Sequence, residues 1–485
     1  MTWLGIDLGT SSVKVLVVHG DGTVVGVATR PYPVLQPEPG AAEQDPNTWW
    51  DATVAAIHDL GALTTEIQGI GLSGQMHGTV LLGADRRLLS PAIIWSDVRS
   101  AAALATLIAQ LGNDQIVTEI GSPIATGFQA ATLAWIRTSR PETWQAIRHV
   151  LLPKDWLRLQ LTGTLATDPS DGASTGMFNV CSRTWSPLIL DALGVQLEQL
   201  PPVLGSGTVA GRLSAHAAAA LGLRAGIPVA TGGADAPLAA LASGIAGHDA
   251  VLATLSSGAQ VTRFSRTPVV DPGARLHTFA SPLSPERNEP EWFLMGATMA
   301  AGSALTWARE RIFQSATSIP DLTAAAAEVP VGAGGLVFTP YLNGERTPHM
   351  DPLARGAFFG LTADHDQRHL TRAIIEGAVF ALRDAFDLLT DLTGPSETVL
   401  LAGGAARSQL WRQTVADCFG IPVVPGTVAD LSAVGAAILA ATAVTGEPAS
   451  QLASRWAAYD EPVVPIPANQ ERLAAIRTVF QTLYS

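Results

Sequence analysis

The chain is poor in cysteine, which limits the kinds of scaffold and site it can build. Only Cys181 and Cys418 occur in 485 residues, far apart and without a CxxC pair or a histidine cluster beside them. This pattern excludes a disulfide scaffold and a zinc ribbon. We therefore expect both cysteines to be inert packing residues.

Charge is also scarce, and positive charge most of all. Charged residues make up 15% of the chain, with 29 Lys and Arg against 42 Asp and Glu, which gives a net charge of −13. Lysine occurs only at Lys14 and Lys154. An acidic chain of this kind argues against nucleic acid or an anionic membrane as the main partner. Any phosphate group that binds must be held by backbone amides, hydroxyls or a metal ion.

Long hydrophobic runs are missing too, although 47% of the residues are apolar. The apolar stretch 433–444 falls well short of the roughly 20 residues that a membrane span requires. The N-terminus has no basic lead and reaches Asp7 at once, so we predict no secretory signal and expect a cytoplasmic protein. At about 100–200 residues per domain, the length predicts two or three domains.

The residue patterns that are present indicate a mixed α/β fold. Strands are expected at 4–7 and 13–18, joined by a turn at 9–12, and again at 67–72, 80–82 and 399–402. Helices are expected at 48–60, 100–111, 130–137, 236–244, 372–389, 408–419 and 432–444.

The plan of the N-terminal hairpin occurs again near the middle of the chain. Residues 250–264 repeat an apolar strand, a turn of hydroxyl and glycine residues, and a second apolar strand. Because this copy starts about half the chain after the first, we predict two similar domains, 1–246 and 247–485. Hairpins of this composition are common, so the repeat taken alone leaves duplication open.

Three glycine-rich turns have the composition of phosphate or nucleotide sites. In GIDLGTSSVK (5–14), open backbone amides with hydroxyls at Thr10, Ser11 and Ser12 can hold phosphate oxygens without positive charge. ATLSSGAQV (253–261) offers the same chemistry, and the strand-to-helix glycines of LLAGGAAR (400–407) leave room for a base or ribose. None is a Walker A loop, which needs GxxxxGK[ST] before a helix. Each could be a plain turn, but their joint order favours a nucleotide clamp.

Carboxylates follow two of the predicted strands. Asp7 precedes the first glycine turn and can hold Mg²⁺ through water, because magnesium keeps most of its waters and takes one or two carboxylates. Asp235 ends GGAD (232–235), where it can serve as a helix N-cap or as the general base for an attacking hydroxyl. Position alone favours the cap.

Two loops carry groups suited to a sugar. SGQMHG (73–78) gathers an amide, a thioether and an imidazole between glycines, which suits a polyol, although a single loop histidine is commonly just solvated. WSDVR (95–99) adds the indole face of Trp95 and the charged pair Asp97 and Arg99, whose other role would be a salt bridge between domains.

Together these residues resemble the FGGY carbohydrate kinases over nearly the whole chain. Single motifs are weak, but their collinear order is specific, and GQMHG with GERTPH is typical of the xylulokinase-like branch. The matching segments are GIDLGTSSVK (5–14), EQDPNTWW (43–50), GQMHG (74–78), WSDVR (95–99), LLPKDWLR (151–158), GGAD (232–235), YLNGERTPH (341–349) and GGAARSQLWRQTVAD (403–417).

The resemblance implies two actin-like, ribonuclease H-like domains that close over sugar and ATP in a cleft between them. It implies ATP-dependent phosphorylation of a ketose, D-xylulose to D-xylulose 5-phosphate, with Mg²⁺ as cofactor and Asp235 as general base. Members of the family are often homodimers. By resemblance, the sugar is bound by Gln75, Met76, His77, Trp95 and Asp235, the metal lies near Asp7, and the nucleotide is bound by Thr10, Ser11, Ser12, Ser256, Ser257, Gly258, Gly302, Gly404 and Ser408.

Three positions depart from the family pattern. Ala236 stands where the family usually has Asn or Gln, SSGA (256–259) where GTSG or GTGG is usual, and Thr132 where a lysine is often found. Losing one amide contact can relax or shift sugar specificity. Ribulose, glycerol or a pentitol therefore stays open as the substrate, and the altered SSGA loop leaves open a nucleotide-gated sensor without catalysis.

Overall fold

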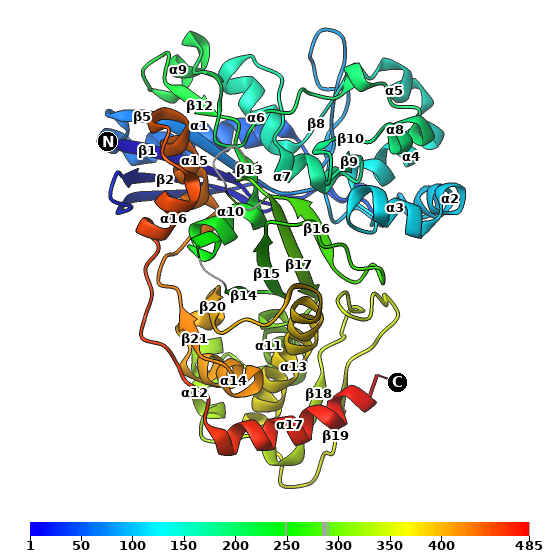
Figure 1. The fold of residues 1–485 in the computed structure, drawn as a ribbon, viewed down its shortest axis with the longest axis vertical. Coiled ribbons are helices and arrows are strands. Elements are labelled where there is room, and N and C mark those ends of the chain that lie inside the picture. The colour runs from blue at the N-terminus through cyan, green and yellow to red at the C-terminus, as the bar shows by residue number, and fades with distance from the viewer. Residues whose placement is uncertain (248–249, 284–288, 290, 485) are drawn as a thin grey trace. The chain divides into compact units, whose positions relative to one another are not determined.

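The computed structural model describes residues 1–247, 250–283, 289 and 291–484, which divide into two compact units (Figure 1). The first unit comprises 1–247, 264–293 and 430–457, and the second 248–263, 294–429 and 458–485. Two later segments thus pack with the first unit, in contrast to a single boundary between 246 and 247. The division into 1–246 and 247–485 stays a prediction, and its last residue, Ser485, lies outside the described residues.

A central sheet organises the first unit. Its seven described strands run in the order β11-β12-β5-β1-β2-β3, with β13 pairing to the end of β5. β2 is antiparallel to both β1 and β3, whereas β5 runs parallel to both β1 and β12. The strands of this unit are β1 (Thr2–Leu8), β2 (Ser12–His19), β3 (Val24–Pro31), β4 (Glu43–Gln44), β5 (Ile67–Gly74), β6 (Val80–Leu82), β7 (Ala92–Ile93), β8 (His149–Leu151), β9 (Phe178–Asn179), β10 (Thr184–Trp185), β11 (Val209–Arg212), β12 (Pro228–Ala230), β13 (Gly233–Ala234) and β16 (His277–Ala280).

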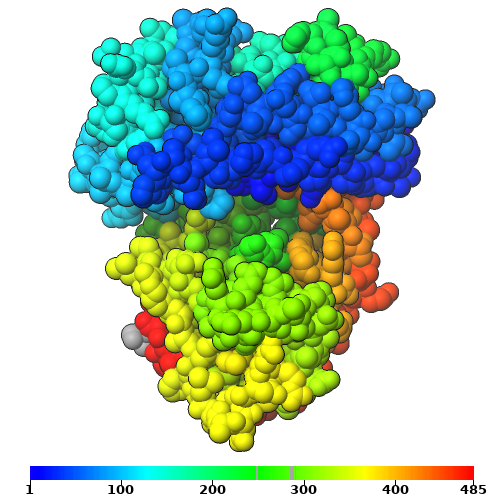
Figure 2. Space-filling model, turned by 180° about the vertical axis from the view of Figure 1, so that it is seen from behind, coloured from blue at the N-terminus to red at the C-terminus, as the bar shows by residue number. Residues whose placement is uncertain are grey.

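Helices cover both faces of this sheet. α1 begins where the Asp45 side chain accepts a hydrogen bond from the Asn47 amide, with Pro46 in the first turn, and it ends at Gly61. The N-terminal residues, in dark blue, form a continuous part of the unit's surface (Figure 2). The helices are α1 (Pro46–Leu60), α2 (Ala101–Leu111), α3 (Asn113–Ile120), α4 (Gln129–Ser139), α5 (Pro141–Ala146), α6 (Pro153–Thr162), α7 (Pro169–Gly172), α8 (Pro187–Leu193), α9 (Ala215–Leu221), α10 (Asp235–Ala242), α15 (Leu431–Thr445) and α16 (Ala449–Trp456).

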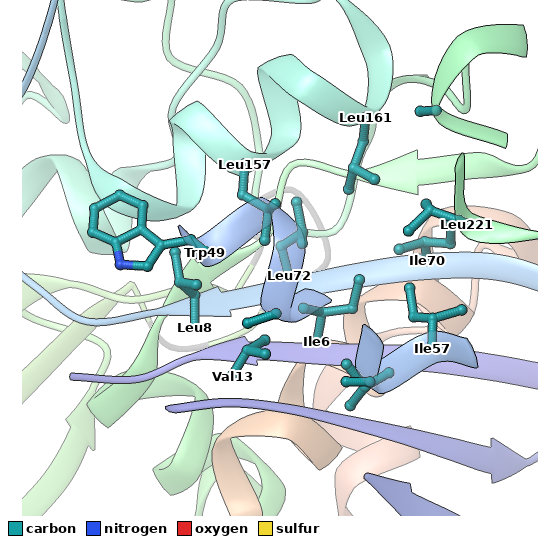
Figure 3. Close-up of a cluster of buried hydrophobic side chains, with 14 of the residues drawn as sticks. Ile6, Leu8, Val13, Trp49, Ile57, Ile70, Leu72, Leu157, Leu161 and Leu221 are labelled. Atoms are coloured by element: carbon teal, nitrogen blue, oxygen red, sulfur yellow. The ribbon is translucent and has the colours of Figure 1, made fainter. Parts of the chain in front are cut away.

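The core of the first unit lies between the sheet and the helices α1, α6 and α9. Alternate residues of the strands point into it, as the two-residue period of a strand requires. Figure 3 shows the strand side chains facing those of the three helices. Its labelled members are Ile6, Leu8, Val13, Trp49, Ile57, Ile70, Leu72, Leu157, Leu161 and Leu221, all essentially inaccessible to solvent.

The opposite face of the sheet is covered by α15, a helix from late in the sequence. A Cβ added at Gly5 would lie 2.1 Å from the Ala433 carbonyl oxygen, and one added at Gly71 would lie 1.8 Å from that of Ala436. Only glycine in the strands permits this backbone approach. The predicted small-residue helix at 432–444 is therefore confirmed, and its small residues allow it to seat closely against β1 and β5.

The second unit contains another sheet, with strands in the order β17-β15-β14-β20-β21. β14 is antiparallel to β15 and parallel to β20, so the expected hairpin at 250–264 is confirmed. Its elements are β14 (Val251–Leu255), β15 (Ala259–Ser265), β17 (Trp292–Thr298), α11 (Gly302–Trp307), α12 (Ile319–Ala326), β18 (Val337–Thr339), β19 (Ala357–Phe359), α13 (Gln367–Thr393), β20 (Val399–Ala402), α14 (Gln409–Phe419), β21 (Val423–Pro425) and α17 (Pro467–Thr482).

The fate of the two cysteines differs from the prediction. Both are free thiols, and Cys418 is partly buried, which raises the pKa of its thiol to about 12. Cys181 is exposed at the turn between β9 and β10, so the expectation that it is a packing residue is wrong. Among the described residues, no helix combines the length and apolarity needed to cross a membrane.

Candidate active site

The turn between β1 and β2 is held in place by its neighbours. The Gly9 amide donates to the Ser12 carbonyl (3.1 Å), and the Tyr32 hydroxyl donates to the Gly9 carbonyl (2.5 Å). Gln44 Nε2 donates to the Thr10 carbonyl (2.7 Å). These bonds fix the turn backbone, while the Ser11 side chain remains exposed and those of Thr10 and Ser12 are half-buried. A fixed turn with accessible hydroxyls is what a phosphate site needs.

Asp7 lies at the end of β1, directly opposite Ser73 of β5. Ser73 Oγ donates to Asp7 Oδ1 at 2.8 Å, so one carboxylate oxygen is already oriented. Burial raises the pKa of Asp7, helped by Asp430 and opposed by the Ser73 hydrogen bond and Lys14. The Lys14 ammonium pairs with Asp430 at 2.5 Å. Asp7 is thus a constrained carboxylate whose negative charge is only partly balanced.

Asp235 is the first residue of α10, and Ala234 occupies the N-cap position. The cap alternative is therefore wrong in its simple form, although Asp235 Oδ1 accepts a hydrogen bond from the Ala236 amide (2.7 Å). Burial, together with the Asp7 carboxylate, raises the pKa of Asp235 to about 7. Near neutral pH this carboxyl can both take up and release a proton, as a general base requires.

The loop after β5 is also more constrained than a solvated loop would be. The His77 ring stacks on Phe128 with 3.9 Å between centroids, and its Nδ1 lies 2.6 Å from the Ser174 carbonyl oxygen. In the neutral ring that contact makes Nδ1 the donor, so Nε2 carries the lone pair. Met76 is buried beside it. His77 therefore presents a fixed edge of its imidazole.

Gln75 is tied into a line of amides. Its Nε2 donates to Gln44 Oε1 (2.9 Å), which also accepts from Trp49 Nε1 (3.2 Å). Gln75 is 1% exposed, and its own Oε1 has no hydrogen-bond partner among the described residues. Gln44 thereby links the loop that carries Gln75 to the Thr10 turn, a connection that the sequence did not reveal.

The WSDVR segment separates into an open aromatic ring and a closed ionic group. Trp95 is 41% exposed, and its Nε1 donates to Thr10 Oγ1 (2.9 Å), so its face is available for stacking. Arg99 pairs with Asp97 (2.7 Å) and Glu43 (2.6 Å) inside the first unit. The predicted salt bridge between domains is therefore wrong for Asp97 and Arg99, because their partners belong to the same unit.

In the second unit, the turn between β14 and β15 is packed against the start of α11. The Gly302 amide donates to the Ser256 carbonyl (2.8 Å), and the amides of Ala301 and Ser303 donate to the Ser257 carbonyl (2.8 and 3.0 Å). Both serine side chains are exposed. A pocket of about 360 Å³ adjoins α11 and is lined by Ala300, Ser303, Trp307, Leu342, Asn343, Arg355 and Gly356.

The two glycines after β20 have different structural roles. Gly403 has φ +88°, and a Cβ there would lie 2.2 Å from the Leu255 carbonyl oxygen of β14. Gly404 faces open space, since no atom lies within 4 Å of its added Cβ. Ser408 is half-buried directly before α14. Gly403 is therefore needed by the fold, whereas Gly404 leaves room for a ligand.

The sequence did not predict a buried ionic cluster that lies near Asp235. It consists of Lys154, Asp155, Arg158, Asp168 and Asp171, and every one of these side chains has no solvent exposure. One sequence feature pointed to it, the segment LLPKDWLR (151–158), which contains one of the two lysines of the chain. The separations along the chain gave no reason to bring three carboxylates to that lysine.

Comparison with known proteins relates both units to one family. Residues 2–242 match the model for the N-terminal domain of the FGGY family of carbohydrate kinases, and residues 256–444 match its C-terminal domain. The chain is 38% identical to the xylulose kinase of Escherichia coli K12 over 92% of this chain and 90% of that protein. It is 34% identical to the xylulose kinase of Bacillus subtilis over 90% and 87%.

A solved structure agrees with these sequence matches. The crystal structure of a xyloylose kinase from Brucella ovis superposes with a TM-score of 0.93 at 33% identity, covering 100% of this chain and 99% of that one. The likeness therefore extends over both units and over every segment that carries a candidate site residue.

Proposed function

The chain belongs to the FGGY family of carbohydrate kinases, and from that premise we propose that it transfers the γ-phosphate of ATP to D-xylulose. The relatives with the highest identities quoted above are xylulose kinases. The observation that supports this chemistry best is Asp235, whose pKa is raised to about 7 at the start of α10. The product is D-xylulose 5-phosphate.

Asp235 acts as the general base in this proposal. Its carboxylate takes the proton of the acceptor hydroxyl while the hydroxyl oxygen forms a bond to the γ-phosphorus and the bond to the leaving ADP oxygen breaks. A base with a pKa near neutrality combines ionisation at working pH with enough basicity to share that proton. Closure over the substrates would exclude water and so limit hydrolysis of ATP.

The remaining residues of the first unit position the sugar. His77 Nε2 accepts a hydrogen bond from a sugar hydroxyl, because Nδ1 is engaged by the Ser174 carbonyl. Trp95 offers its exposed face to the carbon skeleton, and Met76 lines the apolar side. Gln75 serves mainly as a support, since its side chain is almost entirely buried and its amide nitrogen is bonded to Gln44.

The nucleotide is bound by backbone amides and hydroxyls in this proposal. Thr10, Ser11 and Ser12 in the first unit, with Ser256, Ser257 and Gly258 in the second, contact the phosphates, and the nucleoside lies against Gly302, Gly404 and Ser408. The exposed serines and the open space at Gly404 support these roles. They also fit a chain whose net charge of −13 offers phosphate little general attraction.

Mg²⁺ would be held by Asp7 through water. The described residues contain no group of three or more His, Cys, Asp or Glu side chains that could enclose a metal. Magnesium is usually bound by one or two carboxylates with waters and substrate phosphates, so the single carboxylate of Asp7 suits it. When bound, the ion neutralises negative charge on the phosphate oxygens.

The test is a coupled assay of ADP release with D-xylulose, ribulose, glycerol and a pentitol. We expect D-xylulose to give the highest kcat/KM. A higher value for another sugar would overturn the substrate assignment, and Ala236, which lacks the amide usual in the family, is the position to examine first. Asp235→Asn should abolish phosphoryl transfer while nucleotide still binds, whereas Asp51→Asn, on the exposed side of α1, should leave turnover unchanged.

A further inference from the structure

The buried ionic cluster is centred on Lys154. Its Nζ lies 2.5 Å from Asp155 Oδ1, 3.0 Å from Asp168 Oδ1 and 3.4 Å from Asp171 Oδ2. Lys154 and Asp155 belong to α6, Asp168 caps α7, and Asp171 lies within α7. A single ammonium group therefore joins the start of one helix to the two carboxylates of the next segment.

The cluster is close to electrically balanced. Burial disfavours the ionised Asp155, but Lys154 and Arg158 outweigh it and lower the pKa of that carboxyl. Asp171 is different, because burial and the neighbouring carboxylates, including Asp235, raise its pKa well above the ordinary value. The raised pKa of Asp171 lessens the negative charge that the three carboxylates place against the two cations, and a buried site tolerates charges only when they are paired in this way.

One set of hydrogen bonds connects the cluster to the segment that carries Asp235. Arg158 Nη1 donates to the Thr231 carbonyl (2.8 Å). Ser170 Oγ donates to Asp168 Oδ2 (2.5 Å) and accepts from the amide of Ala234 (3.1 Å), the residue before Asp235. The backbone is thus tied to the cluster at Thr231, directly before GGAD, and at Ala234 within it.

A second set connects the cluster to His77. Ser174 Oγ donates to the Asp171 carbonyl (2.7 Å) and accepts from the His77 amide (3.2 Å), and the Ser174 carbonyl faces His77 Nδ1 (2.6 Å). The end of β5 also packs on the lysine, since a Cβ at Gly74 would lie 2.7 Å from Lys154 Cβ. Lys154 is therefore adjacent to both loops that bear the proposed sugar-site groups.

We propose that Lys154 is a positioning residue that holds the base-bearing segment 231–235 and the His77 loop in register through Asp168, Ser170, Asp171 and Ser174. This role rests on the proposed function, because those two segments bear the general base and a sugar ligand. Lys154 touches neither substrate. It acts by fixing where Asp235 and His77 stand relative to each other.

The first test uses Ser170→Ala, which removes one link and leaves every charge in place. We expect kcat for sugar phosphorylation to fall about 10-fold or more, up to the roughly 100-fold loss that a displacement near 1 Å can cause. The KM for ATP should stay the same. Amide hydrogen exchange at Ala234 should become faster. Ser214→Ala, which removes a comparable bond to the Ala217 amide at the start of α9, is the control and should change neither.

The second test separates charge balance from positioning. Lys154→Met leaves the three aspartates of the cluster with Arg158 as their one cation, so loss of folding is one expected result. Lys154→Met combined with Asp155→Asn restores the balance and keeps the Asp168–Ser170 link. We expect this double variant to recover the melting temperature but to keep a reduced kcat and faster exchange at the Ala234 and His77 amides. Recovery of kcat together with stability would overturn the proposal.

Two further outcomes separate the positioning role of Lys154 from the proposed function. Wild-type kcat and unchanged exchange in Ser170→Ala would show that the link does not position Asp235, and would also overturn the proposal. If the unmodified protein phosphorylates no sugar, the proposed function fails, while the exchange measurements still report whether the cluster holds the two loops.

Discussion

Replacing Asp235 by asparagine should make the protein more stable while making it inactive. The carboxylate stands partly buried at the start of α10, near the Asp7 carboxylate, and both features penalise its ionised form. Asparagine has nearly the same shape and cannot ionise, and its side-chain oxygen can still accept from the Ala236 amide. The substitution therefore removes the electrostatic cost and keeps the local hydrogen bond.

The size of this gain in stability follows from two pKa values of Asp235, the ordinary value and the value in the folded protein. An ordinary aspartate has a pKa of 3.8, whereas the pKa of Asp235 in the folded protein is about 7. The folded state thus binds the proton more tightly, so its free energy of unfolding falls as the pH rises between these values. The difference corresponds to about 4 kcal/mol above pH 7. Because the side chain keeps some exposure, solvent screening lowers our expectation to about 2–4 kcal/mol.

The assay is chemical and thermal denaturation of ligand-free protein at several pH values from 5 to 8.5. The stability advantage of Asp235→Asn over the wild type should already be present at pH 5, at roughly a third of its full size, should grow as the pH rises to 7, and should level off near pH 8. Asp51→Asn, an exposed change of the same chemistry, should show no comparable growth. An Asp235→Asn protein less stable than wild type at pH 8, or an advantage independent of pH, would refute the reasoning.

Three further predictions concern activity and nucleotide binding. The kcat/KM for the sugar should rise with pH and level off above about 7, since the base must be ionised, and a pH-rate profile flat from 5.5 to 8 would contradict Asp235 as that base. Gly404→Ala should keep the melting temperature but raise the KM for ATP about 5-fold, a loss of roughly 1 kcal/mol in binding. Gly403→Ala should instead lower the free energy of unfolding by about 3 kcal/mol or more, because its new Cβ would meet the Leu255 carbonyl oxygen. Asp7→Asn should raise the Mg²⁺ concentration for half-maximal activity about 10-fold in a metal titration after chelation, and an unchanged requirement would place the ion elsewhere.

The sequence predicted those parts of the fold that depend on neighbouring residues. The strand–turn–strand units at 4–18 and 250–264 were readable because turn chemistry and alternation act over a few positions. Most of the expected helix ends were right to within two residues for the same reason, since proline, aspartate and glycine mark them locally, but the helix expected at 372–389 extends over Gln367–Thr393. The membership of α15 in the first unit was not readable, because it depends on a match between glycines in β1 and β5 and alanines far along the chain.

The candidate site shows the same division between local and distant information. Motifs pointed to Asp7, His77 and Asp235, but not to what holds each of them, which comes from other segments. Ser73 orients Asp7 only because β5 lies parallel to β1 in this register. Likewise, three aspartates converge on Lys154 from two helices, and neither their spacing nor their composition distinguished them from solvated surface charges.

The late position of α15 also bears on the order in which this protein can fold during synthesis. A ribosome releases β1, β5 and the rest of their sheet long before residues 431–445 emerge. Until then, the face of the sheet that α15 covers stays exposed. At Gly5 and Gly71 this exposed face consists of backbone without side chains, because α15 packs directly against the strands there. The nascent N-terminal part would then depend on chaperones or transient contacts until residues 431–445, close to the end of the chain, are synthesised, and fragments that stop near residue 247 should aggregate.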